Sequence, residues 1–197
     1  MRYKNVSGII LAGGKSRRMG FFKPFLVIDG RRIIDVMIDK LRPFFGEIMI
    51  VTDNKNKFSG FKDVRVVEDL VKECGPLGGI YTGLKKMSEE SAFFIACDMP
   101  FLHNGLIERI LDATVEGNIQ EVVVPLVEGK IEPLHSVYSK IVLPKIKTAL
   151  EQKRLSIKDF LKDCDCKYVE VREDERKSFT NINTRDELRK VKGVESR

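Results

Sequence analysis

Short apolar runs alternate along the chain with longer segments in which apolar positions recur every three to four residues. The short runs fall at 7–12, 25–28, 48–52, 64–67, 92–97, 121–125, 134–138 and 167–171. The helical patterns fall at 31–41, 77–87, 105–113, 141–152, 156–161 and 184–191. Buried parallel strands have such continuous apolar runs, and the helices that connect them carry one apolar stripe. The alternation therefore predicts a doubly wound α/β sheet.

The pattern indicates one domain, residues 1–197. No internal repeat or low-complexity tract divides the chain, and its length suits a single well-filled core. The segment 184–191 begins with Thr184, and Glu187 three residues later completes the spacing of a capping box. The charged stretch 172–177 is predicted to be an exposed loop before the last motif.

Composition narrows the expected partners and location. Lys and Arg outnumber Asp and Glu by 35 to 29, which gives a formal charge of +6 and suits an anionic ligand. The positive residues are mixed with negative ones and there is no Trp, so nucleic acid is not an expected partner. The sequence has neither a signal-peptide-like apolar run nor about 18 consecutive apolar residues, so we expect a soluble, cytoplasmic protein without a membrane span.

The four cysteines are expected to be free thiols. They do not form the dense framework of a disulfide-stabilised scaffold. Cys164 and Cys166 form a CxC pair that could contribute to a metal site, but the paired CxxC spacing of a structural zinc site is absent.

The first apolar run is followed by a stretch rich in glycine and basic residues. It reads Leu11-Ala12-Gly13-Gly14-Lys15-Ser16-Arg17-Arg18-Met19-Gly20, and Lys23 follows three residues later. Glycines let backbone N–H groups approach an anion, and basic side chains supply the charge that several phosphates require. The stretch matches neither the P-loop nor the GxGxxG pattern. A plain strand-to-helix turn would explain the two glycines alone, whereas the whole stretch predicts a nucleoside triphosphate site.

A carboxylate follows the strand predicted at 92–97, within Ala96-Cys97-Asp98-Met99-Pro100. Ligands of open α/β sheets bind outside the carboxyl ends of the strands, so Asp98 is expected to face the same crevice as the glycine stretch. Its hard oxygens suit Mg²⁺, which also binds phosphate oxygens. The alternative is that Asp98 caps the next helix.

Asp69 also follows a predicted strand, at 64–67. A carboxylate there can accept hydrogen bonds from ribose hydroxyls or from the edge of a base, and the sequence leaves both choices open. The glycines of Gly75-Pro76-Leu77-Gly78-Gly79 either let a loop close over the base or open the next helix.

The last motif is Phe179-Thr180-Asn181-Ile182-Asn183-Thr184. In an extended segment Asn181 and Asn183 project to the same side, and their amides both donate and accept hydrogen bonds. Asn183 taken alone could instead cap a helix. His135, one of two histidines, is a candidate substrate contact, although a lone His on a strand is more often packed than catalytic.

These stretches together resemble the molybdenum cofactor guanylyltransferases, the MobA-type family of the nucleotidyltransferases. The resemblance covers nearly the whole chain and follows the family's order. It is carried by the glycine stretch 11–20 with Lys23, then 67–69, 75–79, 97–100 and 179–184. The Gly13-Gly14 pair is similar to the guanylyl members, because cytidylyl and sugar-alcohol relatives usually read Leu-Ala-Ala-Gly there.

The resemblance implies a Rossmann-like three-layer fold with a mostly parallel central sheet. It also implies that GTP and molybdopterin, usually in its Mo-bearing form, react with Mg²⁺ to give the guanine dinucleotide cofactor and pyrophosphate. Acceptor molybdoenzymes and their chaperones are the further partners it suggests.

The resemblance also assigns roles by position. The nucleotide-binding positions would be Leu11, Ala12, Gly13, Gly14, Lys23, Thr52, Asp69 and Asp98. Lys23, Arg17, Arg18 and Asp98 would act in catalysis, with Asp98 holding the metal. Asn181 and Asn183 would lie on the side of the pterin. Thr52 stands where relatives can carry Asn.

Two other functions remain open. One is a different nucleotidyltransferase, which uses CTP or a sugar phosphate. The other is a GTP-binding molybdopterin carrier without catalysis, which would bind GTP and release no pyrophosphate when pterin is added.

Overall fold

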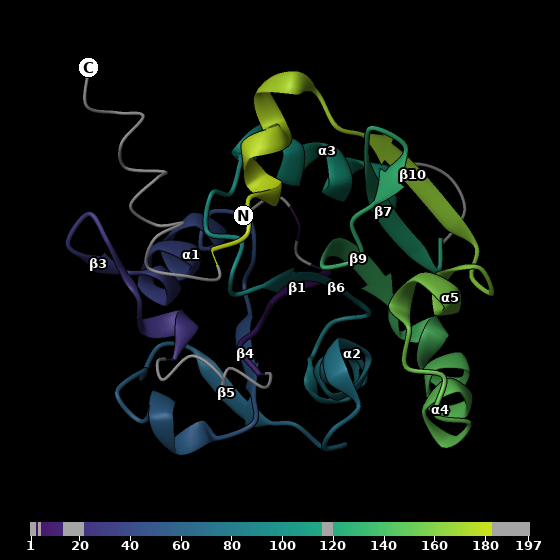
Figure 1. The fold of residues 1–197 in the computed structure, drawn as a ribbon, viewed down its shortest axis with the longest axis horizontal. Helices are drawn as coiled ribbons and strands as arrows, with labels where there is room; N and C mark the ends of the chain where they lie inside the picture. The colour runs from purple at the N-terminus through teal and green to yellow at the C-terminus, as the bar shows by residue number, and fades with distance from the viewer. Residues whose placement is uncertain (1–2, 4, 14–21, 116–119, 183–197) are drawn as a thin grey trace.

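A twisted, eight-stranded sheet forms the centre of the computed structural model, which describes residues 3, 5–13, 22–115 and 120–182 (Figure 1). The strands lie in the order β10-β7-β9-β6-β1-β4-β5, and β8 pairs with β7. Their bounds are β1 Val6–Leu11, β4 Ile48–Thr52, β5 Arg65–Glu68, β6 Ser91–Ala96, β7 Val122–Val127, β8 Lys130–Ile131, β9 His135–Ser139 and β10 Cys166–Glu170. Neighbours in the β6-β1-β4-β5 half are parallel, as are β10 and β7, whereas β9 is antiparallel to β6 and β7. The predicted α/β fold with a mostly parallel sheet is confirmed.

Helices cover both faces of this sheet and complete three layers (Figure 1). The helices α1 (Ile33–Leu41) and α3 (Asn104–Val115) bury their apolar sides in the core on one face. On the other face lie α2 (Gly75–Lys86), α4 (Leu143–Glu151) and α5 (Ile157–Leu161). Within the described part of the chain, no helix is long and apolar enough to cross a bilayer.

The glycine stretch at 75–79 begins α2. Gly75 has a φ of +61°, and the helix starts there, so the helix-opening alternative holds. Further along α2, Gly83 allows a close approach to the sheet, because a Cβ there would lie 2.6 Å from the ring of Phe94. The helix is thereby packed tightly against β1 and β6.

The pattern predicted a strand of the main sheet at 25–28, and this prediction is wrong. The run contains the end of a 3-10 helix, η2 (Lys23–Phe25), and then β2 (Val27–Ile28), which pairs only with β3 (Arg31–Arg32). The reason is tertiary packing. Phe22 and Phe25 lie with their ring centroids 5.6 and 5.2 Å from that of Phe58, in an aromatic cluster beside the sheet.

The stretch 172–177 is exposed at five of its six positions, as its charges predicted, but it is not a loop. It lies mostly in a 3-10 helix, η5 (Glu173–Phe179), in which the side chain of Glu175 is almost completely buried. Its buried carboxylate has a charged partner, described below. The helix predicted at 184–191 lies outside the described residues.

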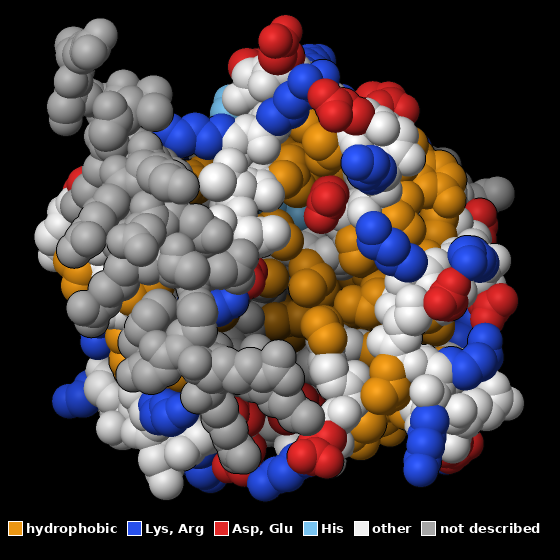
Figure 2. Space-filling view, in the orientation of Figure 1, with side chains coloured by type: hydrophobic (Ala, Val, Ile, Leu, Met, Phe, Trp, Pro, Cys, Tyr) orange, Lys and Arg blue, Asp and Glu red, His pale blue; other side chains and the backbone are white. Residues whose placement is uncertain are grey.

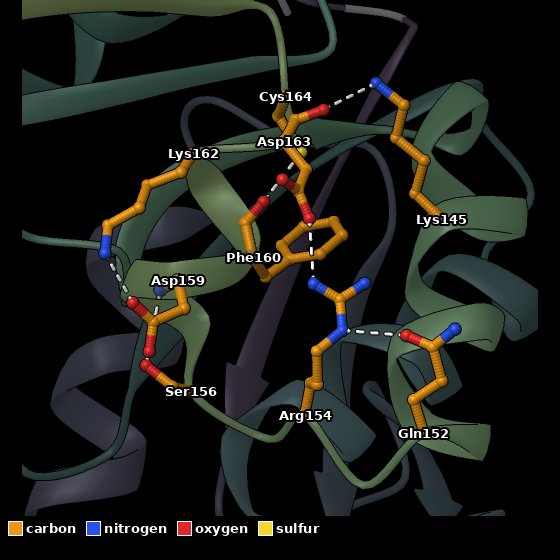
Figure 3. A network of polar contacts seen from close by, with 9 residues as sticks. All are labelled: Lys145, Gln152, Arg154, Ser156, Asp159, Phe160, Lys162, Asp163 and Cys164. Carbon is orange, nitrogen blue, oxygen red and sulfur yellow. Dashed lines mark hydrogen bonds and ion pairs between the residues drawn. The ribbon is translucent and has the colours of Figure 1, made fainter.

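The corner between α4 and α5 is joined by a network of polar contacts (Figure 3). Arg154 donates hydrogen bonds to Asp163 and Gln152, at 3.0 and 2.9 Å, and the Lys145 ammonium donates to the backbone oxygen of Asp163 at 2.8 Å. The thiol of Cys164 donates to the backbone oxygen of Phe160 in the same corner.

Both members of the CxC pair are half-buried free thiols. Burial raises the pKa of Cys164 to about 12 and that of Cys166 to about 11. Their thiols are therefore protonated at neutral pH, and they contribute to packing rather than to nucleophilic chemistry.

Candidate active site

Four neighbouring parallel strands end at one edge of the sheet, next to residues that the sequence predicts to be functional. The positions are Ala12 and Gly13 after β1, Thr52 at the end of β4, Asp69 after β5 and Asp98 after β6. Backbone hydrogen bonds tie these ends together: Ala12 to Val51, Asp69 to Thr52, and Cys97 to Leu11, with N···O distances of 2.8, 2.8 and 3.1 Å. The carboxyl edge of a parallel sheet is where α/β proteins bind ligands.

Leu11 and Ala12, at the start of the glycine stretch, are held in place by backbone hydrogen bonds to Cys97 and Val51. Leu11 and Ala12 are buried, so they can offer a ligand backbone groups but little side-chain surface. Thr52 is fully buried beneath them, and its hydroxyl donates to the backbone oxygen of Ala12 at 3.5 Å. The side chain of Thr52 thus supports the loop from below. Gly14, Arg17, Arg18 and Asn183 lie outside the described residues.

Lys23 and Asp98 meet although they are 75 residues apart, with the Lys23 ammonium 3.3 Å from Asp98 Oδ2. Both side chains keep some exposure, 20% and 24%. Lys23 begins η2, whose Phe25 is anchored in the aromatic cluster. The next helix, α3, begins only at Asn104, so Asp98 is not its N-cap.

Asp98 fits a magnesium ion by its chemistry. Mg²⁺ is commonly held by one or two carboxylates together with substrate phosphates and water. In the described residues no group of three or more His, Cys, Asp and Glu side chains could hold a metal alone. A metal at Asp98 would therefore take most of its ligands from a bound phosphate and from water.

The carboxylate of Asp69 is held by one hydrogen bond from α2 and one from the loop that precedes this helix. Its Oδ1 accepts a hydrogen bond from the Thr82 hydroxyl at 2.6 Å and from the Val71 backbone N–H at 3.3 Å. Thr82 is fully buried in α2, so the orientation of the Asp69 carboxyl group is set by the helix. The remaining acceptor capacity of a carboxylate suits a polar ligand at this edge.

The C-terminal motif reaches the same place. The backbone N–H of Ile182 donates to the backbone oxygen of Asp98 at 2.8 Å, and the Ile182 side chain is fully buried. Asn181 directly precedes this anchor and is exposed. Asn181 is thus the chain neighbour of a residue whose backbone is hydrogen-bonded to that of Asp98.

The sequence profile described as the MobA-like NTP transferase domain matches residues 8–171. The chain belongs to this family. A molybdenum cofactor guanylyltransferase from Desulfosudis oleivorans is 37% identical over 195 residues, with 96% of this chain and 95% of the relative covered. One from Syntrophotalea carbinolica is 33% identical, with 93% and 89% covered. This chain is accordingly a transferase enzyme of the nucleotidyltransferase group.

Solved structures agree with the membership in the MobA-like family. Molybdopterin-guanine dinucleotide biosynthesis protein A from Archaeoglobus fulgidus superposes with a TM-score of 0.81 at 25% identity, covering 95% of this chain and 97% of that one. A 4-diphosphocytidyl-2C-methyl-D-erythritol synthase from Anaerococcus prevotii superposes with a TM-score of 0.70 at 16% identity, covering 98% and 97%. The second comparison shows the shared fold alone.

A buried ion pair in this MobA-like chain was not predicted from the sequence. Arg109 of α3 donates to both carboxylate oxygens of Glu175 in η5, at 2.9 and 2.6 Å, and to the backbone oxygen of Glu170 at 2.6 Å. The Arg172 backbone N–H donates to Glu175 as well, at 2.9 Å. The bond from Arg172 N–H to Glu175 is one half of a capping box, but an arginine has no acceptor for the other half, so the sequence carried no such signal for η5. The pair holds the segment that leads to Asn181.

His135 lies at the start of β9 and is completely buried. Its ring lies between those of Phe93 and Phe179, with centroids 5.2 and 5.0 Å away. Among the described residues neither ring nitrogen has a hydrogen-bond partner. Burial lowers the pKa of His135 to about 3, so the ring is neutral at physiological pH. In this conformation the ring has no surface with which to touch a substrate.

Because the buried nitrogens of His135 have no hydrogen-bond partner among the described residues, replacing the ring with an apolar side chain should stabilise the fold. His135→Leu is expected to raise the free energy of unfolding by about 1–2 kcal/mol at pH 7, because an unsatisfied buried polar group costs about that much. The unfolded histidine, with its ordinary pKa of 6.5, binds a proton before the folded one does. The titration of His135 therefore leaves the free energy of unfolding unchanged above pH 6.5 and lowers it as the pH falls from 6.5 toward about 3.

Urea unfolding between pH 7 and pH 4 measures both effects. His135→Leu should remove part of the acid-dependent loss of stability, whereas His103→Leu, at the other histidine, should leave that part in place. An acid dependence that His135→Leu does not change would contradict the assignment.

Proposed function

We propose that this chain is a molybdenum cofactor guanylyltransferase. It transfers GMP from GTP to the terminal phosphate of molybdopterin or Mo-molybdopterin, releases pyrophosphate and gives molybdopterin guanine dinucleotide. The contact between Lys23 and Asp98 beside the glycine stretch carries the proposal. The names of the relatives at 37% and 33% identity support the choice of substrates.

The reaction needs positioning and charge compensation rather than a general base. The second pKa of a phosphate monoester is near 6, so the attacking phosphate of the acceptor is mostly ionised at neutral pH. The obstacle is repulsion, because two unit charges 4 Å apart cost about 4 kcal/mol at an effective dielectric of 20. The loop N–H groups and Lys23 offset this repulsion, and Arg17 and Arg18 are proposed to join them.

Asp98 would hold Mg²⁺, and the ion would supply charge neutralisation and alignment of the phosphates. Lys23 lies within 4 Å of the same carboxylate, so its ammonium can bind a phosphate oxygen next to the metal position. Leu11, Ala12, Gly13, Gly14, Thr52 and Asp69 are proposed to form or support the nucleotide side. Asn181 and Asn183 are proposed to face the acceptor.

We further propose that residues 1–197 act as one domain, which the continuous sheet across β10 to β5 supports. The reaction is placed in the cytoplasm, where acceptor molybdoenzymes and their chaperones would receive the product. Neither a nucleic acid nor a membrane is assigned as a partner.

The test is an assay of the full chain with GTP, Mg²⁺ and molybdopterin released from a cofactor-bearing enzyme. Pyrophosphate and the guanine dinucleotide are expected in equal amounts, with GTP preferred over CTP, ATP and UTP. A preference for CTP would favour the alternative nucleotidyltransferase. Binding of GTP with no pyrophosphate would favour the carrier.

Lys23→Ala is expected to lower kcat/KM by about 100-fold, in the range found when one donor to a transition-state anion is removed. The measurement is pyrophosphate release under saturating Mg²⁺. Lys147→Ala is the matched control, because Lys147 lies on α4 and pairs only with Glu151 there among the described residues. An unchanged kcat/KM for Lys23→Ala would exclude Lys23 from the site.

A further inference from the structure

Strands β6 and β9 separate at the edge of the sheet that carries the candidate site. They are paired up to Ile95 and His135, and Ala96 N still donates to Leu134 O at 3.2 Å. Before His135 the chain turns at Pro133 and Leu134, His135 N donates to Glu132 O at 3.3 Å across this turn, and Glu132 directly follows β8. Asp98 and Glu132 are thus each two residues away from the last hydrogen bond between the two segments, that of Ala96 with Leu134.

Beyond that point the two chains turn in opposite directions. Cys97 N donates to Leu11 O of β1, which draws the Asp98 side toward the glycine stretch. Glu132 N donates to Pro125 O of β7 at 3.0 Å, which draws Glu132 away from it. Glu132 and Asp98 thus flank the place where the strands separate, with Asp98 on the proposed GTP side.

The turn that carries Glu132 is held rigidly. Its backbone oxygen accepts hydrogen bonds from the Ser136 hydroxyl at 2.9 Å and from His135 N at 3.3 Å. The next backbone oxygen, that of Pro133, accepts one from the Tyr138 hydroxyl at 2.8 Å. A binding group on so constrained a turn is preorganised for a ligand.

Few favourable interactions offset the cost of partly burying the carboxylate of Glu132. In the described ranges no hydrogen bond or ion pair reaches its oxygens, and Lys158 is the one charged group that acts on it appreciably. Burial outweighs Lys158 and raises the pKa of Glu132. A half-buried carboxylate without a hydrogen-bond donor is unfavourable to the fold and is characteristic of ligand sites.

The surroundings suit a flat heterocycle. Ile131 and Leu134, on either side of Glu132, are partly buried and pack against the cores. Figure 2 shows hydrophobic side chains gathered in a hollow at the centre of this face, over β6 and β9 as placed in Figure 1, with charged side chains around it. A planar ring with polar edges could bury its faces there and present its N–H groups to a carboxylate.

We propose that Glu132 determines specificity for the acceptor, by accepting hydrogen bonds from the 2-amino group and the neighbouring ring N–H of its pterin. Two adjacent N–H donors match the two oxygens of a carboxylate, and such charge-assisted bonds are the strong ones. The inference rests on the proposed function, because that function supplies the pterin. It adds a residue 34 positions from Asp98 in the sequence to Asn181 and Asn183 on the acceptor side of the site.

The test compares Glu132→Gln with wild type in the dinucleotide assay. The KM for molybdopterin should rise at least about tenfold while the KM for GTP stays within about twofold, because glutamine removes the charge and replaces one of the two acceptor oxygens with an NH₂ donor. The urea midpoint should not fall, because the variant removes a poorly compensated charge. Glu128→Gln is the matched control: Glu128 lies in the β7–β8 turn of the same region, is exposed, and pairs with Arg176.

A second measurement identifies the part of the acceptor that Glu132 reads. Free pterin should compete with molybdopterin better than lumazine, which carries an oxo group in place of the 2-amino group. Glu132→Gln should abolish that difference.

The outcomes separate the two proposals. If wild type makes no dinucleotide, the proposed function fails. If wild type is active and Glu132→Gln leaves the KM for molybdopterin unchanged, raises the KM for GTP instead, or raises the Mg²⁺ requirement, the assignment of Glu132 alone is overturned.

Discussion

Asp98→Asn is expected to lower Mg²⁺-dependent pyrophosphate release by about 1,000-fold, the largest effect on activity that we predict. The substitution keeps the shape of the side chain and removes the charge, so both a metal and Lys23 would lose their partner. Because the side chain is partly exposed and no packed core depends on its charge, the urea midpoint should stay close to that of wild type. The measurement pairs the pyrophosphate assay with urea unfolding.

Asp63→Asn is the control for this change, because Asp63 is 80% exposed and its one ion pair within the described ranges, with Arg42, is long at 3.9 Å. Its activity should equal that of wild type. A wild-type rate for Asp98→Asn would contradict the role of Asp98 in the transfer. A lost rate that is accompanied by a large fall in the urea midpoint would instead assign Asp98 a structural role.

The sheet could be predicted from the sequence where strands are buried on both faces. The run at 48–52 is β4 residue for residue, because a central parallel strand needs apolar side chains on both sides. The run at 25–28 is also apolar, yet Phe25 packs against Phe58 outside the sheet and Val27 is 50% exposed. A short apolar run alone therefore does not show whether its residues enter the sheet.

The part of the candidate site that could be predicted consists of residues that directly follow predicted strands. Asp69 and Asp98 were identified because parallel strands deliver their carboxyl ends to one edge. Glu132 was not, because its relation to Asp98 depends on the antiparallel register of β9, which no local motif encodes. Likewise, the exposure predicted for 172–177 fails at Glu175 alone, because the Arg109 that pairs with Glu175 lies 66 residues earlier.

Glu175→Ala is expected to lower the free energy of unfolding by about 3 kcal/mol, the largest effect on stability that we predict. It would leave Arg109 without the partner of its two short bonds, in a position that is only 29% exposed. Asp163→Ala is the matched control, because it breaks an exposed pair with Arg154 (Figure 3). Exposed pairs contribute at most about 1 kcal/mol, so the control should change stability little.

The Glu175 pair should also affect activity in a defined way. Since η5 leads through Phe179 to Asn181, loosening it should raise the KM for molybdopterin more than the KM for GTP, whose proposed contacts lie on β1, β4 and β5. Replacing both partners, in Arg109→Leu with Glu175→Leu, should restore part of the stability, because no buried charge is left unpaired. It should not restore the KM for molybdopterin, because two leucines cannot reproduce the bonds to Glu170 and Arg172 that orient the segment. Equal changes in both KM values would contradict this role, leaving the pair a purely structural clamp.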